Sequence, residues 1–194
     1  MMDRSWMKRG PRVFGYEPGW LWWAAVLVVV GFSATYGWFQ LEAYRLNRGY
    51  LEERAAYHAA EQGLDRALVF AVIEAESGWD WRAESGARAK GLMQVTDIAR
   101  DDVIRLEGIG SGNLFDVDYN LRVGTLYLAY LLDRFDGDVA LAVAAYHMGP
   151  TAVAKGQRKD PDLPPRELIR KYGGPQTRAY VKRVLALISE AEEP

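Results

Sequence analysis

The chain has 194 residues, which is enough for one domain of ordinary size and a short appendage. It has no cysteine, which excludes a disulfide framework, a thiolate nucleophile and a cysteine zinc site, and its two histidines, far apart in sequence, form no recognisable metal pair. The formal net charge of −2 argues against a nucleic-acid binder that relies on phosphate attraction. We therefore expect no metal, no other cofactor and no nucleic-acid partner.

An uncharged apolar run occupies residues 20–39. At 1.5 Å per residue, twenty helical residues span roughly 30 Å, the hydrocarbon thickness of a bilayer. Aromatic side chains stand at both ends of the run, as in interfacial belts: Trp20, Trp22, Trp23, Tyr36 and Trp38. A cleaved signal peptide is the alternative, but the run exceeds the usual apolar length and no A-x-A-like cleavage site follows it. We predict an uncleaved transmembrane helix.

Basic residues flank this run on both sides, with a slight excess before it: Arg4, Lys8, Arg9 and Arg12, against Arg45, Arg48 and Arg54. The positive-inside bias predicts that residues 1–19 are cytoplasmic and that the rest lies on the periplasmic side of the inner membrane. Residues 40–62 are polar and rich in Glu, Arg and Ala. They are typical of a juxtamembrane helical linker, in which His58 would be a solvated residue. A globular domain would then occupy residues 63–194.

The domain begins with a helix that Asp65 is suited to cap. Its apolar side chains recur at helical spacing and form one stripe: Leu68, Val69, Val72 and Ile73. Glu76 lies in line with this stripe at the helix end, whereas Glu74 points to nearly the opposite side. An acid in line with an apolar face is costly unless it is protonated or partnered. Glu76 is therefore either a structural acid, paired or capping locally, or a functional one.

The remaining segments also favour helices, and no strand-type alternation of useful length appears. Residues 118–135, 139–146 and 175–190 have helical patterns, and the second is apolar nearly all round, which predicts a buried central helix. Residues 155–165 are basic and proline-rich, which favours a surface loop. We expect a mostly α-helical domain with at most a small irregular hairpin at residues 83–91.

Several short motifs follow one another along the chain: Glu76-Ser77, Ala83-Glu84-Ser85-Gly86-Ala87, Gly91-Leu92-Met93-Gln94, Leu114-Phe115-Asp116 with Asn120, Ala145-Tyr146 before Gly149-Pro150, and Thr177-Arg178-Ala179-Tyr180-Val181. In this order they resemble the transglycosylase SLT domain of lytic transglycosylases, the goose-lysozyme-like enzymes that cleave peptidoglycan. The resemblance covers roughly residues 64–187. It implies a lysozyme-like fold, with the segment from Gly91 opening the helix after the Glu76 loop.

The resemblance also implies a chemistry. Glu76 would protonate the β-1,4 glycosidic oxygen between N-acetylmuramic acid and N-acetylglucosamine, and would then act as a base toward the muramyl C6 hydroxyl, which closes a 1,6-anhydro ring. Tyr146 would bond to the acid, and Ser85, Gln94 and Tyr180 would hold the glycan. Ser77 would support the Glu76 loop. Glycosidases usually need two carboxylates, and four others are near in sequence, but the resemblance implies that none is needed: Asp80, Glu84, Asp97 and Asp101.

The chain departs from the family pattern at three places. Arg88 replaces a common glycine, Val95-Thr96-Asp97 replaces an apolar residue, methionine and proline, and His147 replaces asparagine. These departures leave two alternatives open. One is a catalytically weak, peptidoglycan-binding membrane scaffold, and the other is a lysozyme-like hydrolase on the same fold. The expected partners are glycan strands, the membrane and other proteins of the cell envelope.

Overall fold

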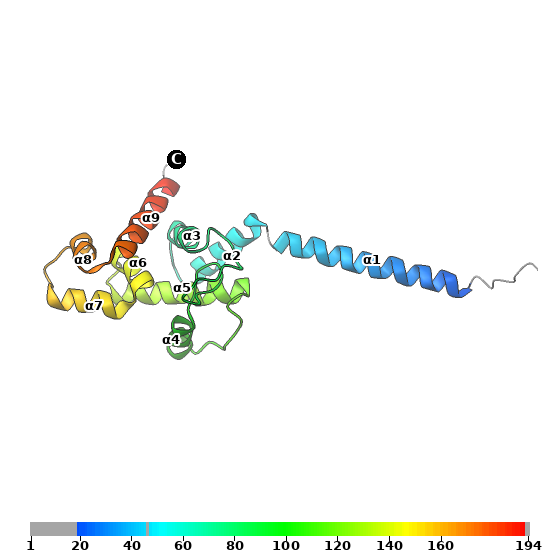
Figure 1. The fold of residues 1–194 in the computed structure, drawn as a ribbon, viewed down its shortest axis with the longest axis horizontal. Coiled ribbons are helices and arrows are strands. Elements are labelled where there is room, and N and C mark those ends of the chain that lie inside the picture. The colour runs from blue at the N-terminus through cyan, green and yellow to red at the C-terminus, as the bar shows by residue number, and fades with distance from the viewer. Residues whose placement is uncertain (1–18, 46, 193–194) are drawn as a thin grey trace, which may run out of the picture. The chain divides into compact units, whose positions relative to one another are not determined.

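The computed structural model describes residues 19–45 and 47–192, with the side chains of residues 23–40 and 47–191. The segment 1–18, for which the sequence predicts a cytoplasmic position, lies outside the described residues. The chain divides into two compact units, Met1–Leu46 and Asn47–Pro194. The first contains α1 (Gly19–Arg45). The prediction of a mostly α-helical protein is confirmed (Figure 1).

The helix α1 is apolar over most of its length and long enough to cross a membrane. Its window Trp23–Gln40 has a mean hydropathy of 1.3, and none of it is buried within the structure. The hydroxyl of Thr35 lies within hydrogen-bonding distance of the carbonyls of Gly31 and Phe32 in its own helix, which satisfies that polar group without water. Length and composition suit a transmembrane helix, and a signal sequence near an N-terminus has the same properties.

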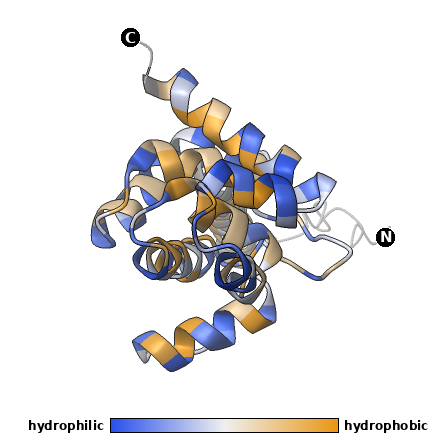
Figure 2. Cartoon of the chain, turned by 90° about the vertical axis from the view of Figure 1, so that its left-hand side faces the viewer, coloured by the Kyte–Doolittle hydropathy of each residue, from blue (hydrophilic) through white to orange (hydrophobic). Residues whose placement is uncertain are grey.

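Eight helices form the described part of the second unit: α2 (Arg48–Glu61), α3 (Arg66–Glu76), α4 (Asp97–Glu107), α5 (Val117–Arg134), α6 (Val139–Met148), α7 (Pro150–Lys159), α8 (Pro165–Tyr172) and α9 (Pro175–Glu192). Most of them carry both hydrophobic and hydrophilic residues (Figure 2). In α6, five consecutive residues are all buried: Leu141, Ala142, Val143, Ala144 and Ala145. The predicted buried central helix is thus confirmed, and it contacts α5, α7, α8 and α9.

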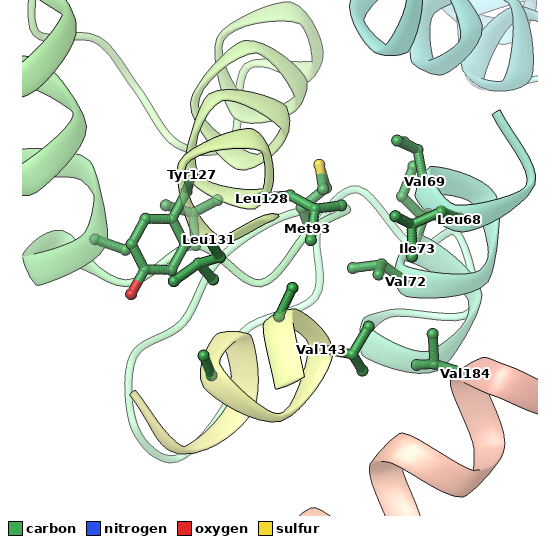
Figure 3. Packing of buried hydrophobic residues seen from close by; sticks show 14 of the residues in the cluster. Leu68, Val69, Val72, Ile73, Met93, Tyr127, Leu128, Leu131, Val143 and Val184 are labelled. Carbon is green, nitrogen blue, oxygen red and sulfur yellow. The ribbon is translucent and has the colours of Figure 1, made fainter. Parts of the chain in front are cut away.

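The core that holds the site is formed where α3, α5, α6 and α9 meet. Val72 and Ile73 of α3 point toward Met93 and toward Leu128 of α5, and Val143 of α6 lies beside Val184 of α9 (Figure 3). Most of these side chains are fully buried. Dense packing on both sides of α3 fixes the direction in which its last residue points.

The helix α2 differs from the predicted linker. Leu51, Ala55 and Ala59 recur every four residues, which forms one stripe, and they are buried against α3 and α5. His58 was expected to be solvated, but it is buried, with its Nε2 3.2 Å from Oδ1 of Asp118. The compact unit therefore begins at Asn47 and not at residue 63, because an alanine-rich stripe is apolar enough to pack even in a polar segment.

Two further local expectations were wrong. The segment from Gly91 to Gln94 does not open a helix: it forms a turn, and α4 begins only at Asp97 after the N-cap Thr96. The backbones of Gly91 and Gln94 are left-handed, with φ of 74° and 45°, which a right-handed helix does not admit. Residues 155–159, predicted as loop, belong to α7. The expected hairpin is present as isolated bridges that join Lys90 to Glu84 and to Val95.

Candidate active site

Glu76 is the last residue of α3. Burial, a hydrogen bond from Tyr180 and the charge of Arg183 all act on its carboxyl group. The helix is N-capped by Asp65, whose carboxylate accepts a hydrogen bond from the Ala67 N–H at 2.7 Å. The side chain of Glu76 is half-buried, and its Oε1 accepts a hydrogen bond of 2.7 Å from the hydroxyl of Tyr180 on α9. Burial raises the pKa of the Glu76 carboxyl to about 7, although the Tyr180 bond and the positive charge of Arg183 act in the opposite direction.

The end of α3 adds to this effect. The carbonyls of a helix C-terminus carry partial negative charge, which disfavours a carboxylate beside them. Arg183 of α9 donates to two of these carbonyls, those of Glu74 and Ala75, at 3.0 and 3.4 Å. The guanidinium thus caps α3 and also lies close enough to Glu76 to lower its pKa somewhat.

Glu74 has a different environment, as the helical spacing predicts. Its Oε2 lies 3.5 Å from Nη2 of Arg48, and its side chain is 36% exposed. Its partner is thus an exposed arginine, whereas the partner of Glu76 is the Tyr180 hydroxyl. The two glutamates are therefore chemically distinct.

The hydrogen bond to the acid comes from a different tyrosine than the resemblance implied. The resemblance assigned the bond with the acid to Tyr146, but the hydroxyl that donates to Glu76 belongs to Tyr180. Tyr146 on α6 donates to the Met93 carbonyl at 2.7 Å. Burial and then the nearby charge of Glu76 raise the pKa of the Tyr146 hydroxyl, so this group lies in the same electrostatic environment as the acid.

Ser77, expected to support the Glu76 loop, and Ser85 and Gln94, expected to hold the glycan, make hydrogen bonds within the loop after α3. Oγ of Ser77 lies 2.8 Å from the Leu92 carbonyl and accepts a hydrogen bond from the Trp79 N–H at 3.1 Å. Oγ of Ser85 accepts from the Ala89 N–H at 3.1 Å. Nε2 of Gln94 lies 3.0 Å from both the Ala83 and the Gly91 carbonyls. These side chains hold the loop that follows Glu76 in its conformation.

Asn120 is the anchor of this loop, and sequence reasoning gave it no role. It is 1% exposed on α5. Its Nδ2 donates to the carbonyls of Lys90 and Leu114 at 2.8 and 2.9 Å, and its Oδ1 accepts from the Met93 N–H at 2.9 Å. A Cβ on Gly91 would lie 2.5 Å from this amide, so only glycine fits there. In the sequence, only the place of Asn120 shortly after Leu114-Phe115-Asp116 indicated that this residue matters.

Two of the departures from the family pattern, Arg88 and His147, can be described in the structure. Arg88 has a left-handed backbone with φ of 61°, which explains why glycine suits this position in the family. His147 lies against Tyr180, with ring centroids 4.7 Å apart, and its Nδ1 is 3.1 Å from Oγ1 of Thr177. Burial lowers the pKa of the His147 imidazole, so it is neutral at pH 7. The tyrosine that binds the acid is thus held between α3 and His147.

Residues 54–169 match the protein family described as "Transglycosylase SLT domain". The chain belongs to this family. It is 28% identical over 128 residues to the soluble lytic murein transglycosylase of Salmonella typhimurium, a match that covers 63% of this chain and 20% of that protein. It is 29% identical over 147 residues to the membrane-bound lytic murein transglycosylase C of Histophilus somni, with coverage of 70% and 39%.

Solved structures of SLT-family proteins have the same fold. An inactive mutant of lytic transglycosylase Slt from Pseudomonas aeruginosa superposes with a TM-score of 0.65 at 30% identity, over 70% of this chain and 23% of that one. The 70 kDa soluble lytic transglycosylase of Escherichia coli superposes with a TM-score of 0.66 at 26% identity, over 74% and 24%. This chain therefore spans about a quarter of the length of these proteins, and the shared part is the SLT domain.

Proposed function

We propose that the chain is a peptidoglycan lytic transglycosylase in which Glu76 acts first as an acid and then as a base. The observation that carries the proposal is the state of this carboxyl. With its pKa raised to about 7, it is protonated in about half of the molecules at neutral pH and can both give and retake a proton. Its relatives are named lytic murein transglycosylases, which supports the same reaction.

In the first step Glu76 gives its proton to the glycosidic oxygen, and the bond from this oxygen to the muramyl C1 breaks. The substrate's 2-acetamido group stabilises the oxocarbenium-like state. The carboxylate that remains accepts the hydrogen bond from Tyr180, and a charge-assisted bond of this kind is stronger than one to the neutral acid.

In the second step the Glu76 carboxylate takes the proton of the C6 hydroxyl, and O6 attacks C1 to close the 1,6-anhydro ring. The acid is regenerated and no water is consumed. A second protein carboxylate is not needed. In support, three of the four nearby acids have other partners: Asp97 and Asp101 pair with Arg100, and Asp80 accepts from the Arg82 N–H.

The products of purified sacculi, measured by mass spectrometry of the released muropeptides, test this proposal. We expect 1,6-anhydromuramyl ends from the full-length protein. Reducing ends would mean that water attacks and that the protein is a hydrolase. Binding of sacculi without release would mean a scaffold. Glu74→Gln provides the matched control for Glu76→Gln, because both remove a carboxylate from the same helix.

We also propose that α1 anchors the domain on the extracytoplasmic side of the inner membrane. Its apolar length and the basic residues before it support this orientation, and some relatives are named membrane-bound. The protein should sediment with membranes and resist high salt. A mature protein whose N-terminus lies near Thr35 or beyond would identify the segment as a signal peptide.

A further inference from the structure

A pocket of about 350 Å³ lies between α6, α8 and α9, on a face of α9 different from the one that carries the candidate active site. Val181 and Leu185 line this pocket. Val181, which is itself buried, follows Tyr180 by one residue, and the half-buried Leu185 follows Val184 by one residue. One residue turns a helix by about 100°, so the pocket and Glu76 use separate faces of α9.

Four cations line the pocket, and no acidic residue does. Arg166 and Arg170 come from α8, and Arg178 and Lys182 from α9. In each pair the residues are four apart, which places them one helical turn or about 6 Å from each other along the axis. The pocket is therefore a groove with a regular row of positive charge on each wall, and we call it the basic groove.

Two of these cations have no partner among the described side chains. Arg170 pairs with Glu167. Arg178 donates through Nη1 to the carbonyls of Arg170 and Gly173, both at 3.1 Å, which fixes its position. Arg166 and Lys182 are exposed and form no hydrogen bond or ion pair with the described residues. The groove thus holds uncompensated positive charge.

Between the charged walls the groove is apolar. Its remaining lining consists of Ala140, Ile169, Val181 and Leu185. Ile169 and Val181 are already buried, and the half-buried Ala140 and Leu185 provide most of the apolar surface that a hydrophobic side chain could still cover. Cationic walls on an apolar strip are complementary to a ligand that has both acidic and aliphatic groups.

The charge of the surrounding segment strengthens this complementarity. Residues 150–185 contain nine basic and three acidic side chains, a net charge of +6 in a chain whose total is −2. This separation of charge attracts an acidic partner to α7, α8 and the first part of α9, and disfavours a basic one.

We propose that the basic groove docks an acidic amphipathic helix of a partner protein. The cations stand one turn apart on both walls, so they match carboxylates one turn apart on either side of an aliphatic stripe. A lipid headgroup presents a single phosphate and would engage only part of this array. The occupant uses neither Glu76 nor Tyr180, so docking leaves the candidate active site free.

The test uses the full-length protein in uncharged detergent micelles and a fluorescein-labelled helical peptide. The leucines of this peptide are spaced alternately three and four residues apart, so that they form one stripe along the helix, and glutamates lie on both sides of the stripe. We expect saturable binding by fluorescence anisotropy, and a loss of affinity of about tenfold or more in the double variant Arg166→Glu with Lys182→Glu. The control Lys155→Glu with Arg158→Glu has the same charge change on α7, outside the groove, and should bind as wild type does.

Several results would overturn the proposal. No saturable binding would show that the groove does not accept such a helix, and equal weakening by the α7 control would show attraction to net charge alone. Unchanged binding of a peptide with serines in place of leucines would exclude a role for the apolar strip. Loss of peptide binding in micelles that contain phosphatidylglycerol would assign the groove to an anionic lipid. Both double variants should digest sacculi as wild type does, and this digestion would show that both variants are folded.

Discussion

The hydrogen bond from Tyr180 to Glu76 predicts a specific effect of Tyr180→Phe on the acid. The bond stabilises the carboxylate and lowers its pKa, while burial raises it. Phenylalanine removes the donor and keeps the ring, so burial and the contact with His147 remain. A hydrogen bond to a charged group contributes about 1.5–3 kcal/mol. At 1.36 kcal/mol per pKa unit, its loss should raise the pKa of Glu76 by about one to two units above its value of about 7.

The pH dependence of sacculus digestion measures this shift. The first step needs protonated Glu76, so kcat/KM should fall as the pH rises through the pKa of the free enzyme. For wild type this alkaline limb should lie near pH 7, and for Tyr180→Phe it should move up by one to two units. The variant also loses a bond to the carboxylate that forms in the reaction, so turnover at the optimum should fall roughly 10- to 150-fold.

Tyr146→Phe is the matched control, because it removes a hydroxyl from the same site. That hydroxyl bonds to the Met93 carbonyl and not to Glu76. A neutral tyrosine has no charge to act on the acid, so the alkaline limb should stay near that of wild type. An unshifted limb in Tyr180→Phe, or the same shift in both variants, would refute the role given to Tyr180.

Three further predictions concern the acid, the loop and the histidine. Glu76→Gln should abolish digestion, while it stabilises the fold by up to about 3 kcal/mol above pH 7. The folded state holds this proton more tightly than the unfolded chain, so wild type loses stability between about pH 4.5 and 7; a urea-denaturation difference that does not grow with pH would contradict this. Gly91→Ala should destabilise the protein more than Gly63→Ala in the same assay, because both backbones are left-handed but only Gly91 has atoms within 4 Å of the added Cβ. His147→Asn removes no charge at pH 7, so turnover should change by less than roughly threefold; a larger loss would mean that His147 takes part in the reaction.

The sequence by itself determined α3, α5, α6 and α9 and the position of the acid. Helical periodicity is local, so Leu68, Val69, Val72 and Ile73 fix the buried face of α3, and Glu76 must follow on that face. The motif order then sufficed to predict the SLT family. Helical spacing also placed Glu76 and Glu74 on different sides of α3, and the nearly continuous apolar sequence of α6 predicted the buried central helix.

Only the tertiary structure decided which groups surround the acid. Tyr180 lies 104 residues beyond Glu76, and Tyr146 lies on another helix at the same site. A hydroxyl donates one hydrogen bond, and the position of each helix determines whether it reaches the carboxylate or the Met93 carbonyl. The hydrogen bonds of Asn120 and the burial of α2 likewise depend on contacts between distant segments. Spacing along the chain carries no information about these contacts, because they arise from the packing of α2, α3, α5, α6 and α9 into one core.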